Sequence, residues 1–142
     1  MRAVAGIICG LVAGLVVTIL VGIIGVGATF TVPAGMDPAN TRQILEAFAG
    51  MPPGSQVALA IAWLAGALVG ALVAKMIARK AWAAWVVTIL MTLYFGLSSL
   101  TLPLPIWAKA LWIVAPLLGG FIGDRLVRAA PPAATADPAA EI

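Results

Sequence analysis

The sequence predicts an all-α membrane protein. The expected fold is a bundle of four transmembrane helices with both termini in the cytoplasm and a short amphipathic helix in the first outer loop. Composition is one reason, because 63% of the 142 residues are hydrophobic and only 9% are charged. A soluble domain has about 25% charged residues, and a soluble chain this apolar could not cover its surface with polar groups. The charges also stand at the ends of four apolar runs, so lipid is the expected solvent.

The first apolar run covers residues 4–30 without a charge. As a helix it would measure about 40 Å, which exceeds the hydrocarbon core of about 30 Å, so it is expected to tilt or protrude. A cleaved signal peptide is the alternative, but the apolar region of such a peptide covers only about 7–15 residues. We therefore interpret this run as a retained span.

The outer loop, residues 31–55, is the only sizeable segment between the apolar runs. Asp37 followed by Pro38 is typical of a helix start, with Asp as N-cap and Pro at the first helical position. The helix expected to follow is amphipathic, with an apolar face made of Ile44, Leu45, Phe48 and Met51. It could be a plain connection, lie flat on the membrane surface or pack over the mouth of the bundle.

The remaining spans are expected at residues 56–74, 81–100 and 106–123. Prolines at 103 and 105 favour a tight reversal between the last two, because each disfavours helix in the residue before it. Residues 1–128 thus form one transmembrane domain. Residues 129–142 are rich in Ala and Pro without apolar periodicity, which is typical of a disordered tail, here cytoplasmic.

The positive charges set the predicted orientation. Six fall on one side of the bundle and two on the other: Arg2, Lys75, Arg79, Lys80, Arg125 and Arg128 against Arg42 and Lys109. Cytoplasmic loops carry the excess of Lys and Arg, so the termini and the middle loop are expected inside. Four tryptophans are expected at the interfaces, namely Trp82 and Trp85 on the inner side and Trp107 and Trp112 on the outer side.

Every span carries small residues at four-residue spacing, which lets helix backbones approach closely in lipid. The candidate packing residues are Gly6, Gly10 and Gly14 in the first span, Ala62, Gly66 and Gly70 in the second, and Gly119 and Gly123 in the fourth. The glycine row of the first span can face the second span inside the bundle. It could instead face a second protein.

The chemistry expected inside the membrane is sparse. The chain has no histidine and one cysteine, Cys9, and the central layers of the spans hold no ionisable residue. No catalytic pair, metal site or cofactor site is therefore expected, and no nucleic-acid contact. The hydroxyls of Thr88, Thr92 and Ser99 either bond to their own helix or line a short polar path.

Three charged residues lie near the ends of the last span. Lys109 can snorkel to the outer surface, and Asp124 with Arg125 ends the span on the inner side. We interpret them as interfacial anchors, with Asp124 and Arg125 as a local ion pair. A gate or a contact with lipid headgroups is the alternative.

Two known families of similar size do not fit. Small multidrug-resistance transporters depend on a Glu in the first span, where this chain has Gly14, Thr18 and Gly22. Fluoride channels carry a phenylalanine, threonine and serine signature in the third span that residues 91–99 do not reproduce.

The chain resembles a family of uncharacterised small bacterial membrane proteins. The likeness lies in the Gly6–Gly10–Gly14 row, in residues 33–38 (PAGMDP) and 51–54 (MPPG), in Trp63 with Gly66 and Gly70, and in residues 102–107 (LPLPIW). It implies a bacterial cytoplasmic membrane and no particular activity. Family members often carry Glu and His in the first span and a His between the two prolines, where this chain has Ile23, Gly27 and Leu104.

Three functions remain open. The leading hypothesis is a non-catalytic protein that acts by helix packing, either as an accessory subunit of a membrane complex or as a homo-oligomer. The second is a small homo-oligomeric transporter or channel, and the third is a protein that binds lipid or a hydrophobic cofactor between its spans. Membrane lipids are expected partners in each case.

Overall fold

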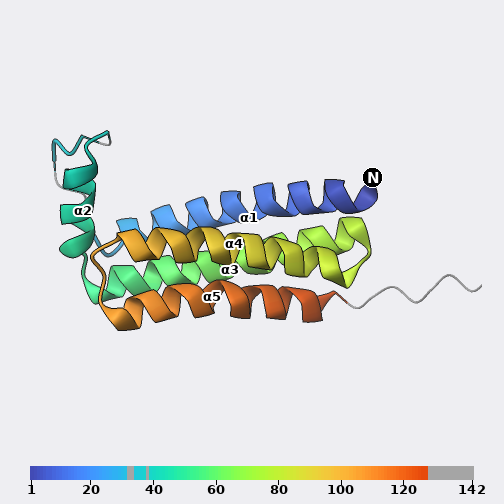
Figure 1. Cartoon of the computed structure of the whole chain (residues 1–142). Helices are drawn as coiled ribbons and strands as arrows, with labels where there is room; N and C mark the ends of the chain where they lie inside the picture. The colour runs from blue at the N-terminus through green and yellow to red at the C-terminus, as the bar shows by residue number, and fades with distance from the viewer. Residues whose placement is uncertain (32–33, 38, 128–142) are drawn as a thin grey trace, which may run out of the picture.

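The computed structural model describes residues 1–31, 34–37 and 39–127, which form five helices and no strand (Figure 1). The helices are α1 (Arg2–Gly27), α2 (Thr41–Ala49), α3 (Pro53–Ala78), α4 (Ala81–Thr101) and α5 (Ile106–Leu126). All except α2 are long and apolar enough to cross a membrane. The predicted all-helical class is thereby confirmed, and the four long helices fit the predicted multi-pass membrane protein. The predicted disordered tail, 129–142, lies outside the described residues.

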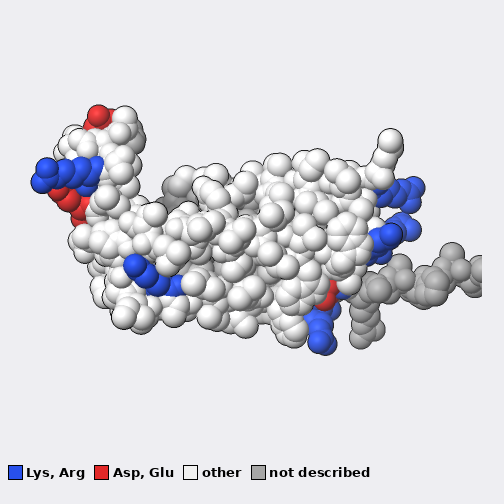
Figure 2. All heavy atoms as spheres, viewed as in Figure 1, with Lys and Arg blue, Asp and Glu red and all other residues white. Residues whose placement is uncertain are grey.

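The four long helices lie side by side, with α3 in contact with α1, α4 and α5 (Figure 1). Helix α1 also touches α4 but has no contact with α5. The start of α1 and the end of α5 lie at one end of the bundle, and α2 lies crosswise at the other. Charged side chains gather near these two ends, with a wide uncharged band between them (Figure 2). This band is the part that lipid can surround.

Helix α3 is longer at both ends than the predicted span 56–74. It starts at Pro53, because Pro52 takes an extended conformation as N-cap and proline is well suited to the first helical position. It ends at Ala78, because Arg79 adopts a left-handed conformation (φ 54°) that stops the helix. Lys75 is therefore part of the helix rather than of the loop after it.

Helix α2 starts four residues after the predicted N-cap at Asp37. Its cap is Asn40, whose side-chain oxygen accepts hydrogen bonds from the backbone N–H groups of Arg42 (3.1 Å) and Gln43 (3.4 Å). The Asp37 carboxylate instead accepts from the N–H of Ala39 at 2.9 Å, which makes a local turn. Pro38 lies outside the described residues. Asn is as good an N-cap as Asp, so residue type alone does not decide between the two positions.

Candidate functional site

The contact between α1 and α3 is a backbone-to-backbone seam. A Cβ atom placed on Gly10 would lie 2.6 Å from the carbonyl oxygen of Gly70, and one on Gly70 would lie 2.9 Å from the oxygen of Gly10. Gly14 stands in the same way against Gly66, at 2.8 Å. Such distances are too short for a real side chain, and backbone atoms cannot move aside cheaply. Glycine is therefore required on both helices.

Helix α5 packs against the other side of α3 with its own glycines. A Cβ on Gly119 or Gly123 would collide with the carbonyl groups of Leu64 or Leu68, respectively. Ala62 of α3, next to Gly22 of α1, is fully buried. All eight packing residues predicted from the sequence thus lie inside the bundle: Gly6, Gly10, Gly14, Ala62, Gly66, Gly70, Gly119 and Gly123. The row of the first span faces α3, so this surface is not available to a second protein.

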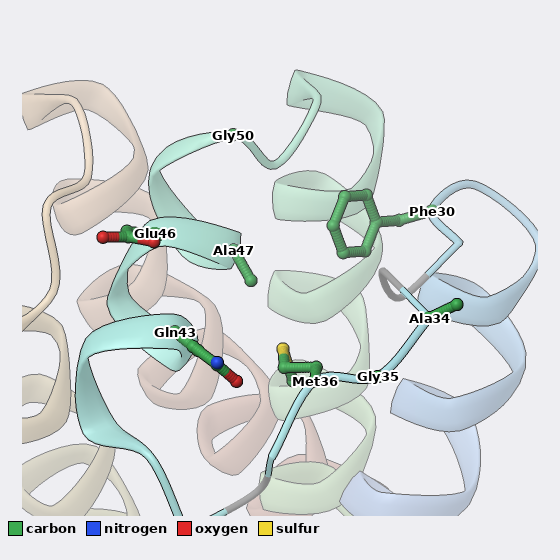
Figure 3. Close-up of a pocket in the computed structure, with 8 residues that line it drawn as sticks. All are labelled: Phe30, Ala34, Gly35, Met36, Gln43, Glu46, Ala47 and Gly50. Atoms are coloured by element: carbon green, nitrogen blue, oxygen red, sulfur yellow. The ribbon is translucent and has the colours of Figure 1, made fainter.

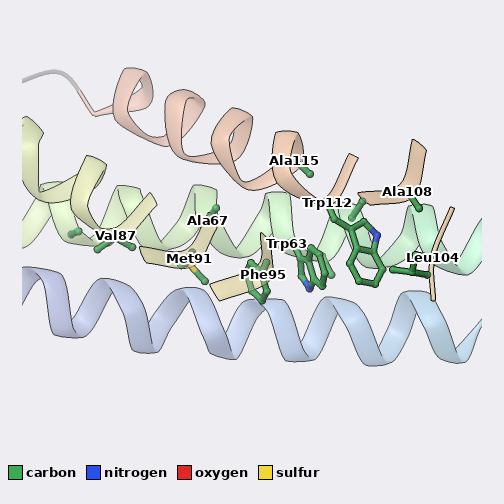
Figure 4. Close-up of a cluster of buried hydrophobic side chains, with 12 residues drawn as sticks. Trp63, Ala67, Val87, Met91, Phe95, Leu104, Ala108, Trp112 and Ala115 are labelled. Atoms are coloured by element: carbon green, nitrogen blue, oxygen red, sulfur yellow. The ribbon is translucent and has the colours of Figure 1, made fainter. Parts of the chain in front are cut away.

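An aromatic cluster fills the bundle near α2 (Figure 4). The ring of Trp63 stacks on Phe95 with centroids 4.5 Å apart, and Trp112 meets Trp63 edge-on at 4.1 Å. Phe48 of α2 adds an edge-on contact to Trp112. The indole Nε1 of Trp112 donates a hydrogen bond to the backbone oxygen of Gln56 at 3.3 Å. The cluster therefore ties α2, α3, α4 and α5 together.

The interfacial assignment of Trp112 is wrong, because this side chain is fully buried. It shares a helical face with Ala108, Ala115 and Gly119, all of which pack inward. These four residues follow one another by four, three and four positions, and this helical spacing already indicated in the sequence that Trp112 belongs to the core. Trp107, which lies off this face, is exposed, as are Trp82 and Trp85 on α4.

Brominated lipids should distinguish these tryptophans. In variants that retain a single tryptophan, bromine on the acyl chains is expected to quench Trp82, Trp85 or Trp107 strongly and Trp112 weakly, because only Trp112 has no exposed surface. Steady-state fluorescence in nanodiscs measures this, and a variant without tryptophan gives the background. Equal quenching of Trp112 and Trp107 would contradict the burial.

The hydroxyl groups do not form one polar path. Each donates to a carbonyl of its own helix: Thr88 to Ala84 at 2.9 Å, Thr92 to Thr88 at 2.8 Å and Ser99 to Gly96 at 2.7 Å. Thr88 is buried against Gly120 of α5. Thr92 instead lines an apolar groove between α4 and α5, on the outside of the bundle. The three hydroxyls are thus satisfied within α4 itself.

A buried ion pair joins α3 to α5 at the end of the bundle that carries the start of α1. The Nζ atom of Lys75 lies 2.7 Å from Oδ1 of Asp124 and also donates to the backbone oxygen of the same residue. The two side chains are only 9% and 16% exposed. The predicted local pair of Asp124 with Arg125 is thus wrong, because the Arg125 guanidinium lies 5.0 Å above the ring of Phe121. Lys109 is half-buried near the opposite end.

Sequence reasoning missed Lys75 because it was assigned to a loop. A signal was present: Lys75 follows Ala71 by four residues on the buried face of α3. An ionisable residue within a spanning helix is rare and almost always paired, so its partner had to be sought on a neighbouring helix.

A separate pocket of about 380 Å³ lies outside the spans, between α2 and the segment before it (Figure 3). Its two polar side chains, Gln43 and Glu46, each make one contact within the loop and α2. Oε1 of Gln43 accepts from the N–H of Asp37 at 2.8 Å, and Glu46 pairs with Arg42 at 3.0 Å. Within the described residues no three His, Cys, Asp or Glu side chains gather as metal ligands. The hydrogen bond between Gln43 and Asp37 therefore ties the segment before α2 to the helix.

Comparisons with protein-family models, with curated proteins and with solved structures gave no match. What the protein does has to follow from its own residues.

Proposed function

We propose that this chain is a non-catalytic protein of the bacterial cytoplasmic membrane that acts by binding, as an accessory subunit of a membrane complex or as a homo-oligomer. The observation that carries this proposal is the closed interior. Glycine seams and aromatic rings fill the bundle, and the hydroxyls expected to line a path bond to their own helices. An interior of this kind leaves the outer surface as the place of function.

Helix α1 supports the proposal. Its buried residues are Gly6, Gly10, Gly14 and Thr18, all on the face toward α3. The rest of the helix presents large aliphatic side chains to its surroundings, among them Val12 and Ile19. A helix held at the edge of the bundle by one narrow face has room for further contacts with lipid or protein.

The orientation we propose places both termini in the cytoplasm and α2 on the outer surface. Arg2, Arg79, Lys80 and Arg125 lie at the end of the bundle where α1 starts, and the only described acid there, Asp124, is paired with Lys75. Cytoplasmic ends carry the excess of Lys and Arg, which favours this placement.

Native mass spectrometry of the protein, extracted in mild detergent from its own membrane, tests the binding role. We expect one fixed partner or one fixed homo-oligomer, and the same sample in a harsh detergent should show the separated chains. A monomer without a partner under the mildest extraction would contradict the proposal.

The alternative function is transport, and a flux assay in proteoliposomes discriminates between transport and the binding role. Thr92 is the one predicted path residue that faces a groove. We expect no substrate-specific flux that depends on it. Transport by the wild-type protein that Thr92→Val abolishes would overturn the binding role.

A further inference from the structure

A second groove, of about 540 Å³, lies between the C-terminal half of α1, the start of α3 and α2. Such a volume is within the range of about 300–1,000 Å³ that is typical of small-molecule sites. Among the described residues that line it, Thr18 has the only polar side chain, and its hydroxyl already donates to the backbone oxygen of Gly14 at 2.9 Å. The groove therefore suits an apolar ligand.

Two glycines open this groove although helix packing does not require them there. A Cβ on Gly22 would reach only ordinary contacts of 3.8 Å with Ala62 and Leu59, and one on Gly27 would meet nothing within 4 Å. This differs from Gly10, where a Cβ would lie 2.6 Å from a carbonyl oxygen. The missing side chains at Gly22 and Gly27 thus leave space beside α1 that the protein itself does not fill.

The length and position of the groove match one leaflet of the membrane. Along α1 it extends from Thr18 to Gly27, which is about 14 Å at the rise of an α-helix. Half of the hydrocarbon core is about 15 Å. Phe48 and Met51 line its other end, at the end of the bundle where α2 lies crosswise (Figure 1).

The crosswise position of α2 decides between the possible occupants. A spanning helix of a partner or of a second copy, laid in the groove, would meet α2 where it leaves the membrane. Toward the middle of the bundle, the seam of Gly14 with Gly66 shuts the space between α1 and α3. A flexible chain that ends within one leaflet meets neither obstacle. We propose that the groove binds one acyl chain of a membrane phospholipid from the leaflet beside α2.

Photo-crosslinking tests this site. The full-length protein is placed in nanodiscs of phosphatidylcholine that contain a phosphatidylcholine with a diazirine near the middle of one acyl chain. After irradiation, mass spectrometry maps the modified residues. We expect modification to concentrate on groove residues such as Ile23 and Met51, several-fold above exposed residues elsewhere on α1 such as Ile8. Uniform modification along α1 would overturn the proposal.

Substitutions that fill the groove give a second test of the site. Gly27→Leu and Gly22→Leu fill the groove and should reduce its labelling several-fold. Gly96→Leu is the matched control, because a Cβ on Gly96 also lies 3.8 Å from its neighbour, Ile113, but in the groove between α4 and α5. Since Gly27 has open space around it, its variant is expected to fold, which circular dichroism verifies. Undiminished labelling in a folded Gly27→Leu protein, or a crosslink to a second copy in place of lipid, would refute the site.

Discussion

Replacing Gly10 with leucine is expected to lower the free energy of unfolding by about 3 kcal/mol, the upper end of the usual cost of overpacking. Its side chain would point at the carbonyl oxygen of Gly70, 2.6 Å from the Cβ position, so α1 and α3 must move apart. The separation also breaks the neighbouring contacts of Gly6 and Gly14. Unfolding in mixed micelles of increasing denaturing detergent, followed by circular dichroism, measures the loss.

Two further variants make this result specific. Gly10→Ala should destabilise in the same direction but less, since only the Cβ has to be accommodated. Gly96→Leu makes the same chemical change where the nearest neighbour is 3.8 Å away, and it should leave stability within about 0.5 kcal/mol of the wild type. Equal stability of the two leucine variants would rule out the seam as the contact that holds α1.

The single substitution Asp124→Leu is expected to cost about 3–5 kcal/mol, the usual effect of leaving a buried charge without its partner. Lys75 would then keep its ammonium group in an apolar contact between α3 and α5. Lys75→Met should be destabilising for the same reason, because it leaves the Asp124 carboxylate alone. The double variant Lys75→Met/Asp124→Leu should recover most of the loss, because it removes both charges.

The exposed pair provides the control for this cycle. The Arg42 and Glu46 side chains are 87% and 64% exposed, so Arg42→Ala should change stability by no more than about 1 kcal/mol. Unfolding curves of the four proteins in the Lys75–Asp124 cycle give the coupling energy. Losses that simply add in the double variant would show that the two side chains do not interact.

The spans and the packing rows could be predicted because each rests on a local requirement. A run of apolar residues long enough for the membrane is visible in the sequence, and so is a row of small residues at four-residue spacing. Which row packs against which depends on the tertiary structure and cannot be predicted from one segment of the sequence. Gly10 opposes another glycine on α3, whereas Gly119 packs on the backbone of Leu64.

The two wrong assignments both concern residues near the ends of helices. Trp112 and Lys75 were assigned by their distance from the end of an apolar run, although their helical face decides their burial. Lys75 is buried because α3 continues to Ala78 and α5 brings Asp124 against it. The groove beside Gly22 and Gly27 was not predictable either, since Gly22 continues the four-residue spacing of the glycine row of the first span until its distance to α3 is known.

The most direct test of the closed bundle is a disulfide between α1 and α3. A Cβ on Gly22 lies 3.8 Å from the Cβ of Ala62, close to the mean separation of about 3.8 Å in disulfides. The protein with Gly22→Cys and Ala62→Cys, in a Cys9→Ser background, should form an intramolecular bond on mild oxidation in the membrane. On a gel it should then migrate as an oxidised monomer that reduction converts back. A covalent dimer, or no bond at all, would contradict the account, because α1 would then pack against something other than its own α3.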